Sequence, residues 1–209
     1  MKTDWTLIQR EEEAQLARLA ATCVARLGKP GLPVDALAML QRCRATTVLT
    51  ARQLISTQMP LPEPMRAALR KCGALTWCRG EREEERRYIV LYRDDLPPAE
   101  RRWNLAHELG HRILRHAFSE TVEERHPKEE AAADLFAGHL LAPQPVLRAL
   151  CGEKGEKEAA KMLGMPEKML RKMLGRYVFF TDRHLEETIC ELLLGKFETE
   201  SIQKANENR

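Results

Sequence analysis

Several features that mark common protein classes are missing from this sequence of 209 residues. Aromatic residues make up only 5% of it, and the net charge of +3 is too small to indicate nucleic-acid binding by itself. No apolar run approaches the roughly eighteen residues of a membrane-spanning helix, and the segment that begins at Met1 has no apolar signal region. The six cysteines form no C-x-x-C pair, which favours separate thiols in a reducing compartment over a disulfide framework. We therefore expect a cytoplasmic protein that does not contact membranes, and direct nucleic-acid binding is not favoured.

The composition and the residue patterns predict a mainly helical α+β fold. Hydrophobic residues make up 44% of the chain, enough for a core, and 31% of charged residues suits well-solvated helices. Apolar side chains recur with helical spacing over residues 16–27, whereas residues 74–79 and 86–92 have the pattern of a β-hairpin. A further helix is expected after Pro97-Pro98. We expect the small sheet to pack beside that helix, with another helical segment at the C-terminal end.

The segment Pro143-Gln144-Pro145 is the best candidate for a domain boundary. It predicts a first domain over residues 1–143, a helical segment over 144–195 and a disordered polar tail over 196–209. The helical segment has two short helices joined at Gly164, a spacing reminiscent of a helix-turn-helix. Its methionine-rich apolar face and its small excess of positive charge suit docking of a protein partner better than DNA readout.

The pentapeptide His107-Glu108-Leu109-Gly110-His111 is an HExxH motif. On a helix, positions i and i+4 lie one turn apart on the same face, so both imidazoles can reach one metal ion. Glu108 is offset by about 100° per residue and reaches the side of the metal where a bound water would sit. The motif predicts a metallohydrolase site, and the competing interpretation is a structural histidine pair.

A pair of carboxylates follows at helical spacing, nineteen residues after His111. Two histidines, a glutamate and a water form one of the standard ligand sets of catalytic zinc, so Glu130 is the expected third ligand. Asp134 lies one turn further along the same face, where it can accept the outer N–H of a ligand histidine and fix its tautomer. His107, His111 and Glu130 are thus the predicted zinc ligands, and Glu108 is the predicted general base.

The transition state of hydrolysis needs a further hydrogen-bond donor beside the metal, and the sequence leaves this donor open. The residues of suitable type are Tyr88, Tyr92, Tyr177, His116 and His139. His116 is five residues from His111, so we expect it to point elsewhere on the helix and to have a surface or structural role. A substrate segment is expected to pair its backbone with the strand over residues 88–92.

Around these residues the sequence resembles the ImmA/IrrE metallopeptidases. The resemblance rests on the strand Arg87–Tyr92, on Arg101–His111 with its alanine directly before HExxH, and on Glu130–Pro143, which follows the family pattern E-x-x-A-[ND]-x-F-A-x-x-L-L-x-P. It extends over about residues 15–145 and is specific over 87–143. The departures from the family pattern, none of them at a proposed ligand, are Trp103-Asn104, His139 and Ala142.

The resemblance implies a small zinc peptidase of the gluzincin type, with zinc as its cofactor. The best-known members cleave helix-turn-helix repressors of mobile elements or of a DNA-damage regulon, which implies a DNA-binding repressor as the protein partner. Two alternatives stay open. One is a non-proteolytic regulator that binds a repressor or DNA and whose metal site is structural or vestigial. The other is a hydrolase of small peptides.

Overall fold

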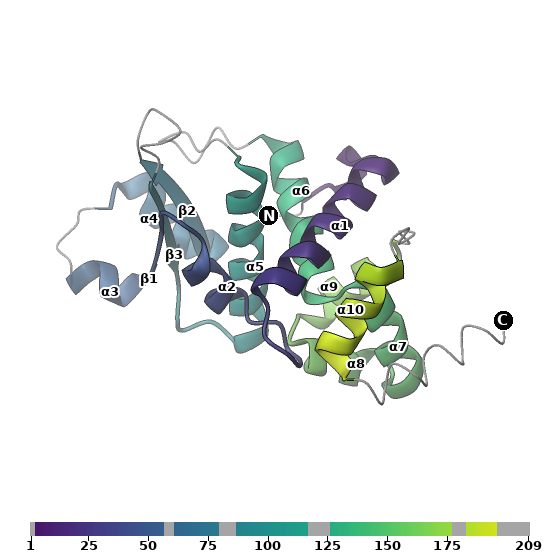
Figure 1. Cartoon of the computed structure of the whole chain (residues 1–209). Coiled ribbons are helices and arrows are strands. Elements are labelled where there is room, and N and C mark those ends of the chain that lie inside the picture. The colour runs from purple at the N-terminus through teal and green to yellow at the C-terminus, as the bar shows by residue number, and fades with distance from the viewer. Residues whose placement is uncertain (1–2, 57–60, 80–86, 117–125, 177–182, 196–209) are drawn as a thin grey trace. The chain divides into compact units, whose positions relative to one another are not determined.

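The computed structural model describes residues 3–56, 61–79, 87–116, 126–176 and 183–195, and within them the chain is mainly helical with one small sheet (Figure 1). A short 3₁₀ helix, η1 (Trp5–Leu7), precedes the α-helices α1 (Arg10–Leu27), α2 (Ala36–Arg42), α3 (Ala51–Ser56), α4 (Glu63–Cys72), α5 (Pro98–Leu114), α6 (Pro127–Leu141), α7 (Gln144–Lys154), α8 (Glu156–Leu163), α9 (Glu167–Leu174) and α10 (Arg183–Leu194). The strands are β1 (Thr46–Thr50), β2 (Ala74–Arg79) and β3 (Arg87–Tyr92). In these ranges no helix combines the length and the apolar character that crossing a bilayer requires. The architecture confirms the predicted α+β fold.

Packing divides the chain into two compact units. The sheet unit consists of Met1–Ile8 and Ala36–Asp134, and the helical unit consists of Gln9–Asp35 and Leu135–Arg209. The division falls inside α6, so this one helix contributes residues to both units. Because the division concerns internal packing, the functional boundary at residue 143 stays a prediction. The predicted tail over 196–209 lies outside the described residues.

The sheet has the strand order β1-β3-β2, with β3 in the centre. β3 runs antiparallel to β2, which confirms the predicted hairpin, and parallel to β1. Val90 and Leu91 of β3 are fully buried, as expected for a β-branched and apolar strand that is covered on both faces. Since both edges of β3 are already paired, the expectation that a substrate pairs its backbone with this strand is wrong.

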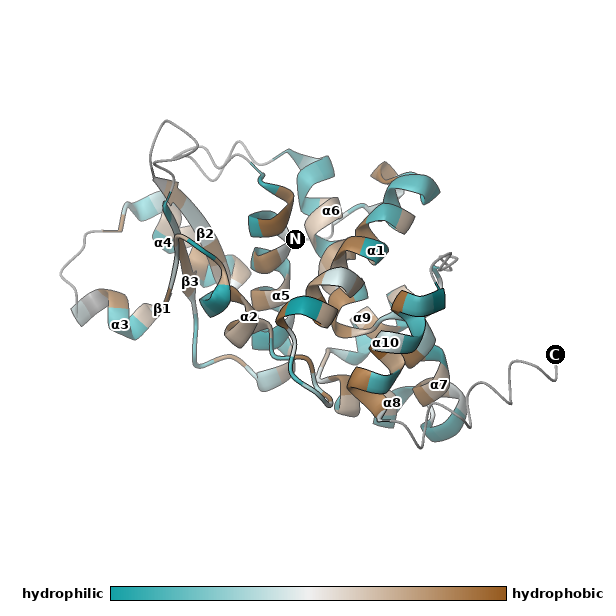
Figure 2. Cartoon of the chain, viewed as in Figure 1, coloured by the Kyte–Doolittle hydropathy of each residue, from teal (hydrophilic) through white to brown (hydrophobic). Residues whose placement is uncertain are grey.

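Successive side chains of the strands alternate between the two faces of the sheet. Leu75 of β2 and Leu91 of β3 are register partners, and both pack into an apolar cluster with α3 and α4. Thr76 and Val90 are the next register partners and point to the opposite face, which α5 covers. Figure 2 shows apolar colour on β2, on β3 and on stretches of α5. The alternation therefore brings one buried polar residue, Thr76, against α5.

In the helical unit α1 packs against α10, and α7 packs against α8 and α10. α8 and α9 are joined at Gly164, whose φ of 61° is a left-handed conformation that glycine adopts without strain, and this confirms the predicted joint. Gly138 of α6 permits a close approach, because a Cβ atom there would stand 2.3 Å from the Sδ atom of Met173 on α9. This contact explains a glycine in the middle of a helix, where it is otherwise unfavourable.

Candidate metal centre

Helix α5 positions the two histidines of the HExxH motif. Pro97 and Pro98 begin the helix, where the missing N–H of proline removes no intrahelical hydrogen bond, and the motif lies in the second half of the helix. His107 and His111 are one turn apart, and their rings meet edge to face with centroids 4.6 Å apart. Their Nε2 atoms are 2.9 Å apart, so the two imidazoles converge on one point. This is the helical arrangement that the i, i+4 spacing predicts.

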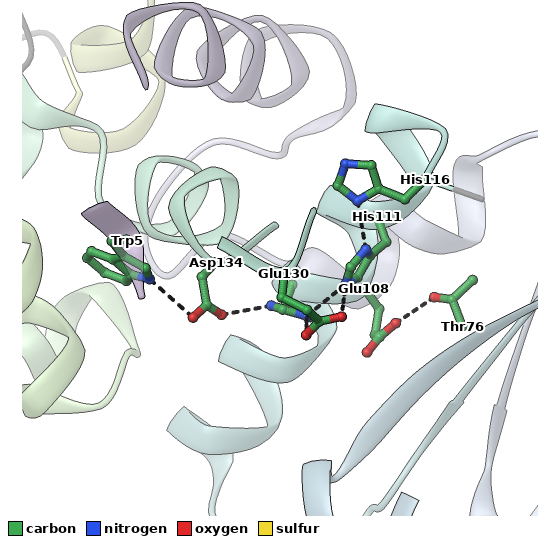
Figure 3. Close-up of polar contacts among 8 residues, drawn as sticks. Trp5, Thr76, Glu108, His111, His116, Glu130 and Asp134 are labelled. Carbon is green, nitrogen blue, oxygen red and sulfur yellow. Dashed lines mark hydrogen bonds and ion pairs between the residues drawn. The ribbon is translucent and has the colours of Figure 1, made fainter. Parts of the chain in front are cut away.

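Helix α6 brings Glu130 to the same point (Figure 3). Its Oε2 atom lies 3.5 Å from His107 Nε2, and its Oε1 atom lies 3.3 Å from His111 Nε2. Both His111 and Glu130 are buried. In the described part of the chain these three residues are the group whose donor atoms could hold one metal ion, since all lie within 4.8 Å of one another.

The donor atoms fit a small divalent ion of the first transition row. A tetrahedral zinc ion with Zn–N bonds of about 2.0–2.1 Å separates its ligand atoms by roughly 3.3 Å. The three separations of 2.9, 3.3 and 3.5 Å lie around that value. Two imidazoles and a carboxylate form a donor set that zinc shares with other ions of the series. Three protein ligands also leave one tetrahedral position for water.

Asp134, one turn after Glu130 on α6, holds the outer nitrogen of His107. Its Oδ1 atom lies 2.8 Å from His107 Nδ1, and its Oδ2 atom accepts a hydrogen bond from Trp5 Nε1 at 3.2 Å. Asp134 therefore lies where its predicted role requires, and that role stays a prediction. Trp5 was missed by the sequence analysis because it is 129 positions from Asp134 and no local spacing connects the two.

The buried imidazoles and carboxylates shift one another's proton equilibria. Burial disfavours the charged form of His107, but its hydrogen bonds to Asp134 and Glu130 outweigh this effect and raise the pKa of His107 to about 10. Burial also raises the pKa of Glu130, but the hydrogen bonds from His107 and His111 outweigh it and hold the pKa of Glu130 far below its usual range. Glu130 is therefore ionised, and a proton on His107 or a metal cation offsets its buried charge.

Glu108 lies beside the metal cluster formed by His107, His111 and Glu130, on the face of α5 that meets the sheet. It is buried, and its Oε2 atom accepts a hydrogen bond from Thr76 Oγ1 at 2.7 Å (Figure 3). Thr76 is also buried, at 3% exposure, so the bond is shielded from solvent. The sequence predicts Glu108 as a site residue but not Thr76. The sequence feature that could have indicated Thr76 is its hydroxyl, which interrupts a mostly apolar strand on the side that faces α5.

His116 lies against the metal cluster, so the expectation that it points elsewhere is wrong. α5 ends at Leu114, and Arg115 adopts a left-handed conformation with φ 55° and ψ 35°. This turn carries His116 back, and its Nδ1 atom lies 2.8 Å from His111 Nδ1. Burial, together with the nearby His111 and His107, lowers the pKa of His116 to about 4.

Two of the other residues considered as oxyanion donors, Tyr88 and His139, have contacts of their own. The ring of Tyr88 lies beneath the guanidinium of Arg112, 4.0 Å from it, and Arg112 also donates to Thr46 Oγ1. His139 belongs to the helical unit, where its Nε2 atom lies 3.2 Å from Glu13 Oε1. Tyr177 lies outside the described residues.

Comparison with known families agrees with the geometry. The family model of the IrrE N-terminal-like domain, Peptidase_M78, matches residues 75–175. The matched stretch contains the HExxH helix, Glu130, Asp134 and Thr76, and it ends just after α9. No curated protein matches the chain.

Proposed function

Because residues 75–175 place this chain in the IrrE N-terminal-like (Peptidase_M78) family, we propose that it is a zinc-dependent endopeptidase. The observation that carries the proposal is the convergence of His107, His111 and Glu130, with the carboxylate of Glu108 buried beside them. The proposed substrate is a helix-turn-helix transcriptional repressor of a mobile element or a stress regulon, and this part rests on the family resemblance.

The residues of the cluster divide the chemistry among them. His107, His111 and Glu130 would hold the zinc, which when bound supplies a water of lowered pKa and polarises the scissile carbonyl. Glu108 accepts a proton from the attacking water and passes it to the leaving amine. Because the Thr76 hydroxyl donates to Glu108 Oε2, we assign the proton transfer to Oε1. Asp134 holds His107 with its Nε2 atom facing the cluster.

The substrate segment is proposed to pair with the edge of β2. β3 is flanked by β1 and β2 and so offers no edge for a further strand. β2 borders β3 on one side, and its Thr76 contacts Glu108, which puts this strand next to the proposed general base. Backbone pairing of an extended segment with a sheet edge gives affinity with little sequence preference. Recognition of one repressor would therefore depend on contacts outside the cleaved segment.

The α8–α9 pair favours the alternative function, a non-proteolytic regulator that binds a repressor or DNA. The two helices are joined at Gly164 with the spacing of a helix-turn-helix. However, Arg171 on α9 forms ion pairs with Glu156 and Glu167, which reduces the positive charge that this helix presents. DNA affinity depends on such uncompensated charge, so the peptidase remains the better-supported proposal.

Co-expression tests the proposal directly. The chain would be produced together with a small helix-turn-helix repressor from a neighbouring reading frame, and the repressor would be followed by gel electrophoresis. The wild-type chain should cut it. Glu108→Gln should keep its zinc and its fold but cut roughly 10²–10⁴-fold more slowly, because the general base is gone.

The matched control is Glu100→Gln, an exposed glutamate on the same helix, which should cut at the wild-type rate. Undiminished cleavage by Glu108→Gln would remove Glu108 from its role. A wild-type chain that contains zinc and binds the repressor without cutting it would favour the regulator instead.

A further inference from the structure

We propose that His116 is a positioning residue of the metal centre. Its neutral imidazole accepts the Nδ1–H of His111 and thereby holds His111 with the lone pair of Nε2 directed at the metal. The inference rests on the proposed function only in assuming that a metal ion binds to His107, His111 and Glu130.

The backbone at the end of α5 brings His116 to His111. On a continuous helix a residue five positions further on is rotated by about 140° and faces another direction. Instead, the left-handed Arg115 ends the helix, and the backbone N–H groups of Arg115 and His116 both bond to the carbonyl oxygen of His111. Residues other than glycine and asparagine seldom adopt this conformation, because their Cβ atom crowds the following carbonyl oxygen. The strained residue is thus the one that turns His116 toward the cluster.

The contact between the two rings requires a defined proton position. The Nδ1 atoms of His111 and His116 are 2.8 Å apart, with ring centroids 5.0 Å apart, so one nitrogen must donate and the other accept (Figure 3). His111 Nε2 is the atom that faces Glu130 and His107, and a metal-binding nitrogen cannot also carry a proton. His111 therefore carries its proton on Nδ1, and His116 is the acceptor.

The two ligand histidines are accordingly held by different groups. Asp134 gives His107 a carboxylate acceptor, whereas His116 gives His111 a neutral imidazole acceptor. A hydrogen bond to a charged acceptor is the stronger of the two. We therefore expect His116 to affect metal affinity measurably, but less than Asp134 does.

Zinc affinity of paired variants tests the role. In competition with a chromophoric chelator, His116→Leu should bind Zn²⁺ roughly 10-fold more weakly than the wild type, because it lacks an acceptor. His116→Asn places its Oδ1 atom where Nδ1 stood and should stay within about threefold of the wild type. His184→Leu, an exposed histidine on α10, is the control and should not change the affinity. Wild-type affinity in His116→Leu, or an equal loss in His116→Asn, would show that His116 only packs and would overturn the inference.

Nuclear magnetic resonance of the chain labelled with ¹⁵N-histidine tests the hydrogen bond without any variant. The expected result is a protonated Nδ1 on His111 and a scalar coupling across the hydrogen bond to His116 Nδ1. Protonation of His111 at Nε2, or no coupling, would overturn the inference. A chain that shows the bond and binds zinc but cuts no repressor would instead contradict the proposed function alone.

Discussion

The described part of the chain contains two buried clusters in which histidine meets glutamate, and the two clusters differ in the groups that face the carboxylate. The metal cluster of the sheet unit consists of His107, His111 and Glu130. The arginine cluster of the helical unit consists of Glu13, His139 and Arg176. Helix α6 contributes a residue to each of them, Glu130 to the first and His139 to the second.

In the arginine cluster the counter-ion is permanent. Arg176 places its Nε atom 2.7 Å and its Nη2 atom 2.6 Å from Glu13 Oε2, and a guanidinium does not lose its proton in proteins. In the metal cluster the groups that face Glu130 are two imidazoles, which can release a proton and bind a metal. A histidine beside a glutamate is therefore no sign of a metal site by itself. What distinguishes the two clusters is the third group, which is an arginine in one and a second imidazole, able to bind a metal, in the other.

The largest expected effect comes from removing the carboxylate of the metal cluster. Glu130→Ala should reduce zinc from about one ion per chain to a small fraction of that, because two imidazoles alone bind the ion weakly. Elemental analysis after dialysis measures it. The neighbouring Glu129→Ala should keep its zinc. If Glu130→Ala holds a full equivalent of zinc, another residue is the third ligand and the contrast between the clusters fails.

The corresponding change in the arginine cluster should affect stability and not zinc. Glu13→Gln removes the carboxylate that faces Arg176 and should lower the free energy of unfolding by about 2–3 kcal/mol, as measured with urea at pH 7. Glu11→Gln, exposed on the same helix, is the control and should lower it by less than about 0.5 kcal/mol. A loss of zinc in Glu13→Gln would break the comparison.

The ion pair between Glu13 and Arg176 also predicts that the stability of the protein depends on pH. Burial raises the pKa of Glu13, but hydrogen bonds from His139 and Arg176 outweigh it and hold the pKa of Glu13 below its usual value of 4.5. The folded state thus favours the ionised carboxyl, so its stabilisation is present above pH 4.5 and is lost as the pH falls through the lowered value. The difference in stability between wild type and Glu13→Gln should therefore shrink in urea titrations repeated well below that pH. A constant difference would contradict this.

A smaller effect on zinc binding is expected from replacing Asp134, whose carboxylate contacts the outer nitrogen of His107. Asp134→Asn should weaken zinc binding roughly 10–100-fold without abolishing it, since the charged acceptor for His107 Nδ1 is replaced by a neutral amide. Competition with a chelator measures the change. Asp95→Asn, exposed and paired with Arg93, serves as the control. Unchanged zinc affinity in Asp134→Asn would return Asp134 to an ordinary helix carboxylate.

The smallest expected effect is that of Trp5, which supports Asp134. Trp5→Phe keeps a ring in the buried position but removes the N–H that bonds to Asp134 Oδ2, and should weaken zinc binding about 2–5-fold. Trp77→Phe, elsewhere in the sheet unit, should leave the affinity unchanged. If the two variants bind zinc equally tightly, the hydrogen bond from Trp5 to Asp134 does not contribute to zinc affinity.

The site residues that could be predicted from the sequence are those that recur with helical spacing. His107 with His111, and Glu130 with Asp134, are i, i+4 pairs, and each pair lies on a single helix that its own residues specify. The hairpin of β2 and β3 was predictable for the same reason, since its pairing is local. α3 was not predicted, although Thr50 and Gln53 exchange the backbone-to-side-chain hydrogen bonds of a capping box before it.

The features of the fold and of the site that could not be predicted depend on chain reversals and on long-range packing. The central place of β3 results from the parallel pairing with β1, and no local pattern shows which strands become neighbours. The position of His116 depends on the left-handed Arg115, a conformation in which glycine or asparagine is the usual residue. The contact of Thr76 with Glu108 appears only once the sheet has packed on α5.

The contact between Trp5 and Asp134 has a consequence for the making of the protein. During synthesis Trp5 leaves the ribosome 129 residues ahead of its partner, and Asp134 and Glu130 emerge together on α6 after the HExxH helix is complete. At elongation rates of about 5–20 residues per second this delay is several seconds or more. A nascent chain therefore displays the two histidines before it has either carboxylate of α6, so the proposed metal site would be complete only after α6 has been translated.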